Sequence, residues 1–321
     1  MGKAKKTMII LSIIIASLLL IGIIITYTLL GKVHRENISQ DEDDLGIGLE
    51  EPWDLSEFED LEGIDNGLLD ENNIYQDVEG ISNIALFGID AEEGTTGRSD
   101  SIMIVTVDEN RDKIKLSSLV RDSYVNIPDR GMDKIGHAYA FGGPQLALKT
   151  INSNFKLNIK HYATVNFTTL PLIIDTVGGV KIDITAQEAR HVPGIDSEGS
   201  YLLDGKQALA FSRIRKLEGG DFERSRRQRD VIKSLVSAGM DMNIKKYPGF
   251  INNVLPHLTT NLSSNEILSL ATKVAINNID TMEDKMFPEN EYSQGAMLDN
   301  VYYYVFNRNK AIESIHEFIY K

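Results

Sequence analysis

The sequence contains no cysteine, which excludes disulfide bonds, thiolate metal ligands and cysteine nucleophiles. Its six histidines are scattered, and no pair of them has the spacing of metal ligands, so we expect no zinc site. The chain is acidic, with a formal net charge of −14. At 321 residues it has room for one large domain or two small ones beside a membrane segment.

Basic residues are also missing from residues 36–80, which hold seventeen Asp and Glu and no Lys or Arg. Without this segment the rest of the chain carries +3, so the acidity is local. Its few apolar residues, among them Trp53, Leu55, Phe58 and Leu61, follow no sustained period. We predict a mostly extended, self-repelling spacer over residues 31–80. The alternative is an acidic segment that docks on a basic pocket.

Charge is absent again from residues 8–30, which are rich in Ile and Leu. Twenty-three residues at helical rise cross about 30 Å of hydrocarbon. Lys3, Lys5 and Lys6 precede the run, and Lys32 and Arg35 follow it, so the positive-inside bias is slight. We predict a cytoplasmic tail (1–7) and a single-pass signal anchor (8–30), with the rest extracytoplasmic in the cell envelope. A cleaved signal peptide is the alternative.

The folded part starts near residue 81 and extends to 321. Apolar runs and alternating patterns predict strands over 83–89, 102–107, 113–119, 162–167 and 180–184, with a turn over 125–128. Helical spacing and caps predict helices over 136–155, 168–176, 204–210, 231–240, 263–277 and 309–320. Strands that alternate with helices favour a layered α/β domain with helices on both faces of the sheet.

Residues 211–230 are the most basic part of the chain. They contain six arginines: Arg213, Arg215, Arg224, Arg226, Arg227 and Arg229. On a strand-like segment Arg213 and Arg215 would point to one side, and Asp221 could cap a following helix. That helix would place Arg224 and Gln228 on one face. Guanidinium groups match phosphate oxygens, so we predict an anion pocket formed by Arg213, Arg215, Arg224 and Arg227. A solvated helix face or a nucleic-acid patch is the alternative.

Three further charged groups stand at the ends of predicted strands: Asp90, Arg98 with Asp100, and Arg121 with Asp122. In open α/β sheets, ligands bind where the loops at strand ends converge. Two aspartates from different loops suit a hard divalent cation, and the arginines between them would hold phosphates. Taken singly, each pair could equally be a surface ion pair worth about 0 to 1 kcal/mol.

Nine short motifs then occur in a fixed order. They are Gly88-Ile89-Asp90, Gly97-Arg98-Ser99-Asp100, Ser118-Leu119-Val120-Arg121-Asp122, Asp133-Lys134-Ile135-Gly136-His137-Ala138-Tyr139, Gly142-Gly143, Val165-Asn166-Phe167, Asp175-Thr176-Val177-Gly178-Gly179-Val180, Arg213-Ile214-Arg215 and Asp221-Phe222-Glu223-Arg224-Ser225-Arg226-Arg227-Gln228. In this order they resemble the LytR-CpsA-Psr family of membrane-anchored enzymes of Gram-positive cell envelopes. The resemblance covers roughly residues 81–240 and implies a three-layer α/β/α sandwich with a central mixed sheet.

The resemblance also implies an activity. Family members are understood to be phosphotransferases that take a glycopolymer, such as wall teichoic acid or capsular polysaccharide, from a polyprenyl-pyrophosphate carrier. They join it through a phosphodiester to peptidoglycan. The expected partners are therefore this donor, the peptidoglycan acceptor and the membrane, with no nucleic acid. Two rival functions are a lipid pyrophosphatase and a non-catalytic binder of polyprenyl phosphate or a polyanion that regulates wall metabolism.

Site residues carry over onto matching positions. Asp90 and Asp100 match the family's metal-associated aspartates, so Mg²⁺ or Mn²⁺ is implied as cofactor. The pyrophosphate-binding positions are matched by Arg98, Arg121, Arg213, Arg215, Arg224 and Gln228, and Lys134 lies in a motif that would touch phosphate. The catalytic group would comprise Arg121, Arg224 and two possible proton acceptors, Asp122 and Asp221. Val120 and Glu223 depart from the family pattern, where a proline and a small residue are common.

A polyprenyl tail also needs an apolar groove. The predicted helices offer five apolar residues that could form it: Leu146, Leu148, Leu170, Leu172 and Ile173. The default explanation for such residues is ordinary core.

Overall fold

The computed structural model describes residues 30–58, 61, 64, 75–89, 97–215, 217, 220–240, 252–277, 279 and 281–321. Nearly all of the predicted anchor, residues 8–30, lies outside this part of the chain. Across the described ranges, no helix combines the length and apolar character needed to span a bilayer.

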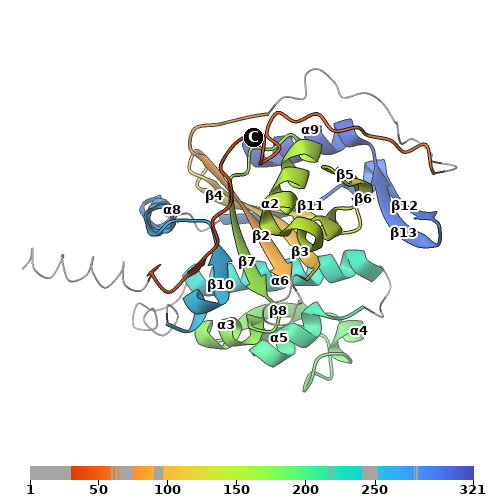
Figure 1. Cartoon of the computed structure of the whole chain (residues 1–321). Helices are drawn as coiled ribbons and strands as arrows, with labels where there is room; N and C mark the ends of the chain where they lie inside the picture. The colour runs from red at the N-terminus through yellow and green to blue at the C-terminus, as the bar shows by residue number, and fades with distance from the viewer. Residues whose placement is uncertain are drawn as a thin grey trace, which may run out of the picture.

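A seven-stranded mixed sheet forms the centre of the molecule (Figure 1). Its strands lie in the order β1 (His34–Arg35), β10 (Leu258–Thr260), β7 (His161–Asn166), β2 (Ile81–Ile89), β3 (Ser99–Asp108), β4 (Lys113–Leu119) and β11 (Thr281–Phe287). The β2–β3–β4 meander is antiparallel, whereas β7 and β11 run parallel to their neighbours β2 and β4. The mixed character of the sheet is as predicted.

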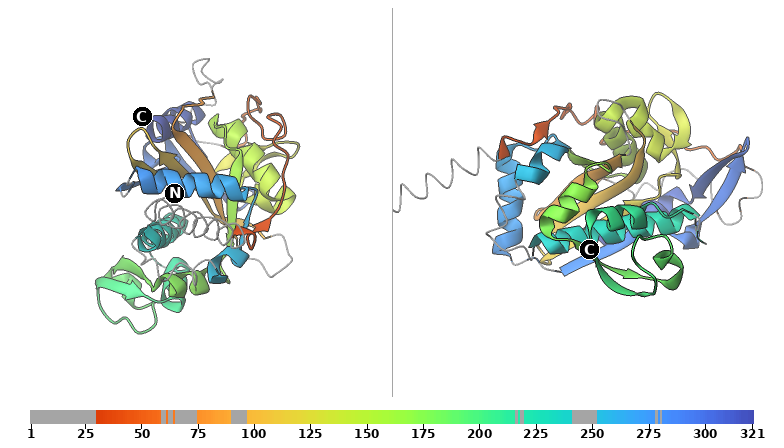
Figure 2. Two further views of the ribbon diagram at one scale, coloured as in Figure 1. Left: turned by 90° about the vertical axis from the view of Figure 1, so that its left-hand side faces the viewer. Right: turned by 90° about the horizontal axis from the view of Figure 1, so that it is seen from below.

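Helices cover both faces of this sheet, which gives three layers (Figure 2). One layer contains α2 (Ile135–Phe155) and α9 (Arg308–Tyr320). The other contains α3 (Leu170–Val177), α5 (Gly205–Ser212), α6 (Gly220–Met240) and α8 (Ser264–Ile276). Alternate strand residues face opposite layers: Ile104 belongs to the core cluster under α2 and α9, and Val105 packs in the cluster with α6 and α8.

Three two-stranded units lie outside the central sheet. They are β5 (Tyr124–Ile127) with β6 (Gly131–Lys134), β8 (Val180–Ile184) with β9 (Gly199–Leu203), and β12 (Ser293–Leu298) with β13 (Val301–Phe306). The short elements α4 (Ala186–Ala189), η2 (Leu255–His257) and η3 (Asn290–Tyr292) complete the described structure. The turn predicted over 125–128 is wrong, because its first three residues belong to β5.

Two predicted helix starts are confirmed by their hydrogen bonds. Asp204 accepts from the backbone of Gln207, and the Gln207 side chain accepts from the backbone of Asp204. Ser263 and Glu266 form the same reciprocal arrangement at the start of α8. Each capping box satisfies two backbone N–H groups that would otherwise have no partner within the helix.

Residues 31–58 do not form the detached spacer that their charge predicted. Leu45 and Leu55 are almost fully buried, and Glu36 donates its backbone N–H to the Thr260 carbonyl. Lys156 forms an ion pair with Glu50 at 2.5 Å. A few well-placed apolar side chains, together with cations on the domain, therefore outweigh the mutual repulsion of the acidic residues.

Candidate active site

Strand register brings two of the three charged groups together, the one with Asp100 and the one with Arg121. Ile102 of β3 pairs with Leu119 of β4 in antiparallel register. Asp100, two residues before Ile102, and Arg121, two residues after Leu119, therefore become neighbours at the same sheet end. The Nη1 atom of Arg121 lies 2.6 Å from Oδ1 of Asp100. The predicted convergence is confirmed for the strand ends that carry Asp100 and Arg121.

A recess opens beside this pair, and we call it the acid–lysine recess. It is lined by Arg98, Ser99, Asp100, Arg121, Asp122, Lys134, Gly136 and His137. Asp122 is buried, and its Oδ1 atom lies 2.9 Å from Nζ of Lys134, the residue at the end of β6 that precedes α2. The Nε atom of Arg121 lies 3.4 Å from the other Asp122 oxygen. Lys134 therefore lies in the same recess as Arg121 and Asp122, and its contact with phosphate stays a prediction.

Gly136 allows α2 to lie close to this recess. Its N–H donates to the carbonyl oxygen of Arg121 at 2.9 Å. A Cβ at this position would lie 3.1 Å from the carbonyl oxygens of both Arg121 and Ser99. The sequence showed this glycine only as part of the 133–139 motif, and its packing role depends on contacts that the sequence does not reveal.

The second half of the site is the arginine pocket, a cavity of about 290 Å³. It is lined by Asp100, Phe167, Ser212, Arg213, Arg215, Arg224 and Gln228. Arg224 is 2 % exposed, and its Nη2 atom lies 3.6 Å from Oδ1 of Asp100. The Nη2 atom of Arg215 lies 3.8 Å from Oδ2 of the same carboxylate. Asp100 thus belongs to both recesses and faces guanidinium groups from three segments of the chain.

The predicted convergence of Arg213, Arg215, Arg224 and Gln228 is confirmed, although the local structure differs from the prediction. Arg213 is the C-cap residue of α5 with φ −97° and ψ 1°, and not part of a strand. Both Arg213 and Arg215 are exposed on the segment that leaves α5. Arg224 and Gln228 lie one helical turn apart on α6, so they share a face as the spacing predicted.

Arg227 does not join this cluster, which corrects its predicted role as a phosphate ligand. Its Nε atom lies 2.8 Å from Oε1 of Glu188, and its Nη1 donates to the Ile214 carbonyl at 3.1 Å. Burial alone would raise the pKa of Glu188, but hydrogen bonds from Thr185 and Arg227 lower it below its usual range. Arg227 therefore joins α6 to α4 and the α5–α6 connection.

The remaining arginines of this stretch also have structural partners. Arg226 pairs with Glu223 and Asp230 on its own helix and with Glu188. Arg229 pairs with Asp284 of β11 at 3.0 Å. Part of the basic stretch is thus used to hold α6 against the domain.

Two predicted residues cannot be placed by their side chains. Asp90 lies outside the described residues. Asp221 lies in the first turn of α6, which begins at Gly220, and its side chain is likewise not described. Among the residues that the structure does describe, no three Asp, Glu or His side chains are grouped as metal ligands. The Asp100 oxygens face the guanidinium groups of Arg121, Arg215 and Arg224. The described side chains around Asp100 therefore do not by themselves form a metal site.

A small apolar cavity adjoins the arginine pocket. It is lined by Leu86, Phe87, Gly88, Ser101, Val165, Phe167, Leu170, Ser212, Gln228, Val231 and Ile232, and it shares Phe167, Ser212 and Gln228 with that pocket. Of the predicted groove residues, only Leu170 lines it. Leu148 of α2 belongs to the core cluster on the other face of the sheet, and Leu146 packs against that cluster. Both are therefore core residues, which was the default expectation for them.

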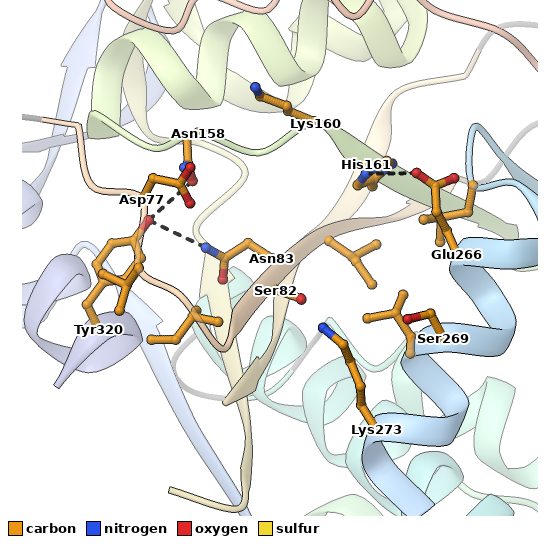
Figure 3. Close-up of a pocket in the computed structure, with 15 residues that line it drawn as sticks. Asp77, Ser82, Asn83, Asn158, Lys160, His161, Glu266, Ser269, Lys273 and Tyr320 are labelled. Carbon is orange, nitrogen blue, oxygen red and sulfur yellow. Dashed lines mark hydrogen bonds and ion pairs between the residues drawn. The ribbon is translucent and has the colours of Figure 1, made fainter. Parts of the chain in front are cut away.

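A larger cavity of about 320 Å³ lies at the opposite end of β2 (Figure 3). Its lining includes Asn83, His161, Glu266 and Lys273, with 3.5 Å between Nε2 of His161 and Oε1 of Glu266. None of the predicted site residues lines it, so volume alone does not locate the candidate site.

The sequence matches the LytR_cpsA_psr family over residues 60–318. The chain belongs to this family. A 244-residue alignment shows 36 % identity to the polyisoprenyl-teichoic acid–peptidoglycan teichoic acid transferase TagU of Oceanobacillus iheyensis and covers 73 % of each chain. The TagU of Enterococcus faecalis is 34 % identical over 71 % of this chain and 77 % of its own length.

A solved family structure shares the fold. The YwtF (TagT) protein of Bacillus subtilis with bound octaprenyl pyrophosphate lipid has a TM-score of 0.60 and 23 % identity to this chain. The likeness covers 77 % of this chain and 95 % of that one. The family match over residues 60–318 extends well beyond residues 81–240, which carried the resemblance seen in the sequence motifs.

Proposed function

We propose that this protein transfers a glycopolymer from a polyprenyl-pyrophosphate carrier to peptidoglycan and forms a phosphodiester. The observation that carries the proposal is the convergence of Arg121, Arg215 and Arg224 on Asp100, beside an apolar cavity. The names of the TagU relatives and the lipid in the TagT structure describe the same donor chemistry for those proteins.

In the proposed reaction, a peptidoglycan hydroxyl oxygen forms a bond to the distal phosphorus. The bond from that phosphorus to the bridging oxygen breaks, and polyprenyl phosphate leaves. Arg121, Arg215 and Arg224 neutralise the charge that builds on the phosphate oxygens, and they act through position and electrostatics. The hydroxyl proton passes to a carboxylate, for which Asp122 is the candidate within the described site.

The proposal includes a divalent cation held by Asp90 and Asp100. Mg²⁺ or Mn²⁺ there would add positive charge at the diphosphate. If it binds, Mg²⁺ should raise the melting temperature of the wild-type protein in the presence of a pyrophosphate probe. Asp100→Asn should abolish that rise, whereas an equal rise in the variant would contradict the metal assignment.

We also propose that residues 8–30 anchor the protein in the cell membrane, with the catalytic domain outside the cell. The uncharged run and the lipid-linked donor support this topology. Protease treatment of intact cells should digest the C-terminal domain, and full protection would contradict the topology and revive a nucleic-acid partner.

One experiment separates the candidate functions. The full-length chain is incubated with a labelled lipid-linked donor, with and without peptidoglycan glycan, and the products are separated. A transferase yields a labelled glycan adduct only when glycan is present. Free polymer phosphate in both reactions indicates a pyrophosphatase, and unchanged donor in both indicates a non-catalytic binder.

A further inference from the structure

The β12–β13 hairpin adjoins the acid–lysine recess through its backbone. The N–H of Tyr304 donates to the carbonyl oxygen of Asp122 at 2.8 Å. The Nζ atom of Lys134 lies 5.4 Å from the centre of the Tyr303 ring. The hairpin extends outward beyond the main body of the domain (Figure 1). Anything bound along it would thus approach the site from the Asp122 side.

The two faces of this hairpin differ in their surroundings. The inner face places Ala296, Leu298 and Tyr303 against Leu55, Phe58 and Tyr124. The outer face carries Met297 opposite Tyr302, and these side chains are 61 % and 42 % exposed. Two large apolar side chains side by side in solvent are the kind of surface that marks a binding site.

Gly295 fixes the position of the Tyr302 ring. The ring reaches back diagonally from its own pair toward the Asp122 end of the hairpin. A Cβ at position 295 would lie 2.7 Å from Cε2 and 2.8 Å from the hydroxyl oxygen of Tyr302. The ring therefore lies against the glycine backbone while its exposed side faces solvent. An aromatic ring held in this way offers an apolar face with a polar edge, which suits the C–H face of a sugar ring.

Charge distinguishes between the two saccharides of the reaction. Residues 288–307 contain Glu289, Glu291 and Asp299 and no Lys or Arg, and Glu289 pairs with Lys285 at 3.0 Å. The remaining charge on this surface is negative, so it would repel an anionic donor polymer such as wall teichoic acid, but it would not repel the uncharged sugar rings of a glycan strand.

The position of the hairpin relative to the pockets also favours the acceptor glycan as its ligand. This step of the argument rests on the proposed function. The apolar cavity joins the arginine pocket through Phe167, Ser212 and Gln228, and the pocket joins the acid–lysine recess through Asp100. The β12–β13 hairpin contacts Asp122 and Lys134, which line the acid–lysine recess but not the arginine pocket. A hydroxyl that attacks in line must come from the side opposite the leaving lipid phosphate. We propose that the outer face of β12–β13, centred on Tyr302, binds a sugar ring of the acceptor glycan.

The test measures transfer by the full-length chain while the concentration of soluble peptidoglycan glycan fragments is varied. Tyr302→Ala should raise the KM for the glycan about two- to tenfold, since it removes the aromatic ring against which the sugar packs. The KM for the lipid-linked donor should change less than about twofold. Tyr302→Phe keeps the ring and should restore most of the glycan affinity. Leu202→Ala, on the β8–β9 hairpin, removes an apolar residue that is more exposed than Tyr302 (68 % against 42 %) and should have no effect.

The outcomes separate this inference from the proposed function. If wild type transfers and Tyr302→Ala leaves the glycan KM unchanged, the acceptor surface is wrong and the transferase assignment stands. If the donor KM rises instead, the hairpin binds the donor and the inference is overturned. If wild type transfers nothing, the transferase assignment fails, and calorimetric binding of the same fragments to wild type and Tyr302→Ala decides the inference alone. Equal binding, or none, would then reject it.

Discussion

Arg121 and Asp100 form a 2.6 Å ion pair across the ends of two adjacent strands. The same carboxylate faces Arg215 and Arg224 at 3.8 and 3.6 Å. Three guanidinium groups would repel one another without it. Asp100 therefore holds these arginines together, and in the proposed reaction it would share them with the phosphate.

The first prediction concerns Arg121. Arg121→Gln should lower kcat/KM for transfer about 10²- to 10³-fold, because it removes a cation that stabilises charge in the transition state. Arg121→Lys should recover only part of this loss, since an ammonium group cannot contact two oxygens in the guanidinium geometry. Arg190→Gln, at the end of α4 on the exposed surface, is the matched control. Equal rates for all three variants would contradict a phosphate-binding role for Arg121.

The second prediction concerns the close approach of α2. Gly136→Ala would place a Cβ 3.1 Å from the carbonyl oxygens of Arg121 and Ser99. We expect activity to fall at least about tenfold, because displacement of Arg121 by a few tenths of an ångström disturbs phosphate alignment. Gly239→Ala on α6 meets no atom within 4 Å and should stabilise the protein by about 0.5 to 1 kcal/mol without loss of activity. Thermal unfolding and transfer rates of both variants check this.

Local patterns in the sequence identified the parts of the fold that depend on nearby residues. The strands over 113–119 and 180–184 and the capping boxes at Asp204 and Ser263 follow from period and spacing. The site at the strand ends was predictable for the same reason, because charged residues directly flank the apolar strands.

The features that the sequence did not predict depend on contacts between residues that are far apart in the chain. Nothing beside Arg227 in the sequence indicates that Glu188, thirty-nine residues earlier, would bind it in the interior. Leu55 gave no periodic signal, yet it is buried in the cluster with Tyr124 and Val305. The Glu188–Arg227 pair and the burial of Leu55 both depend on which distant segments come into contact, and local sequence patterns do not predict such contacts.

The third prediction follows from the buried Glu188–Arg227 pair. Glu188→Gln would remove the nearer carboxylate from the guanidinium of Arg227, which is 2 % exposed, and leave only Glu223 at 3.9 Å. Loss of one partner of such a pair costs about 3 to 5 kcal/mol. The folded pKa of Glu188 is lowered, so its contribution is present above the unfolded pKa and is lost as the pH falls through the folded pKa. Denaturant unfolding at neutral and acidic pH measures both effects, with the exposed Glu198→Gln as control. A variant as stable as wild type at neutral pH would refute the structural role.

The last prediction concerns His316 in α9. Its Nε2 atom lies 3.0 Å from the Phe155 carbonyl oxygen, and burial lowers the pKa of the imidazole below 6.5. The unfolded chain therefore binds a proton at a higher pH than the folded chain, so stability should fall as the pH drops from about 6.5. Within that window the loss is at most about 1.4 kcal/mol per pH unit for this group. His316→Gln can still donate to the carbonyl and should flatten this part of the profile, whereas His191→Gln, at an exposed position, should not. Melting temperatures between pH 7.5 and 5 provide the measurement, and a profile unchanged by His316→Gln would show that other groups set the acid sensitivity.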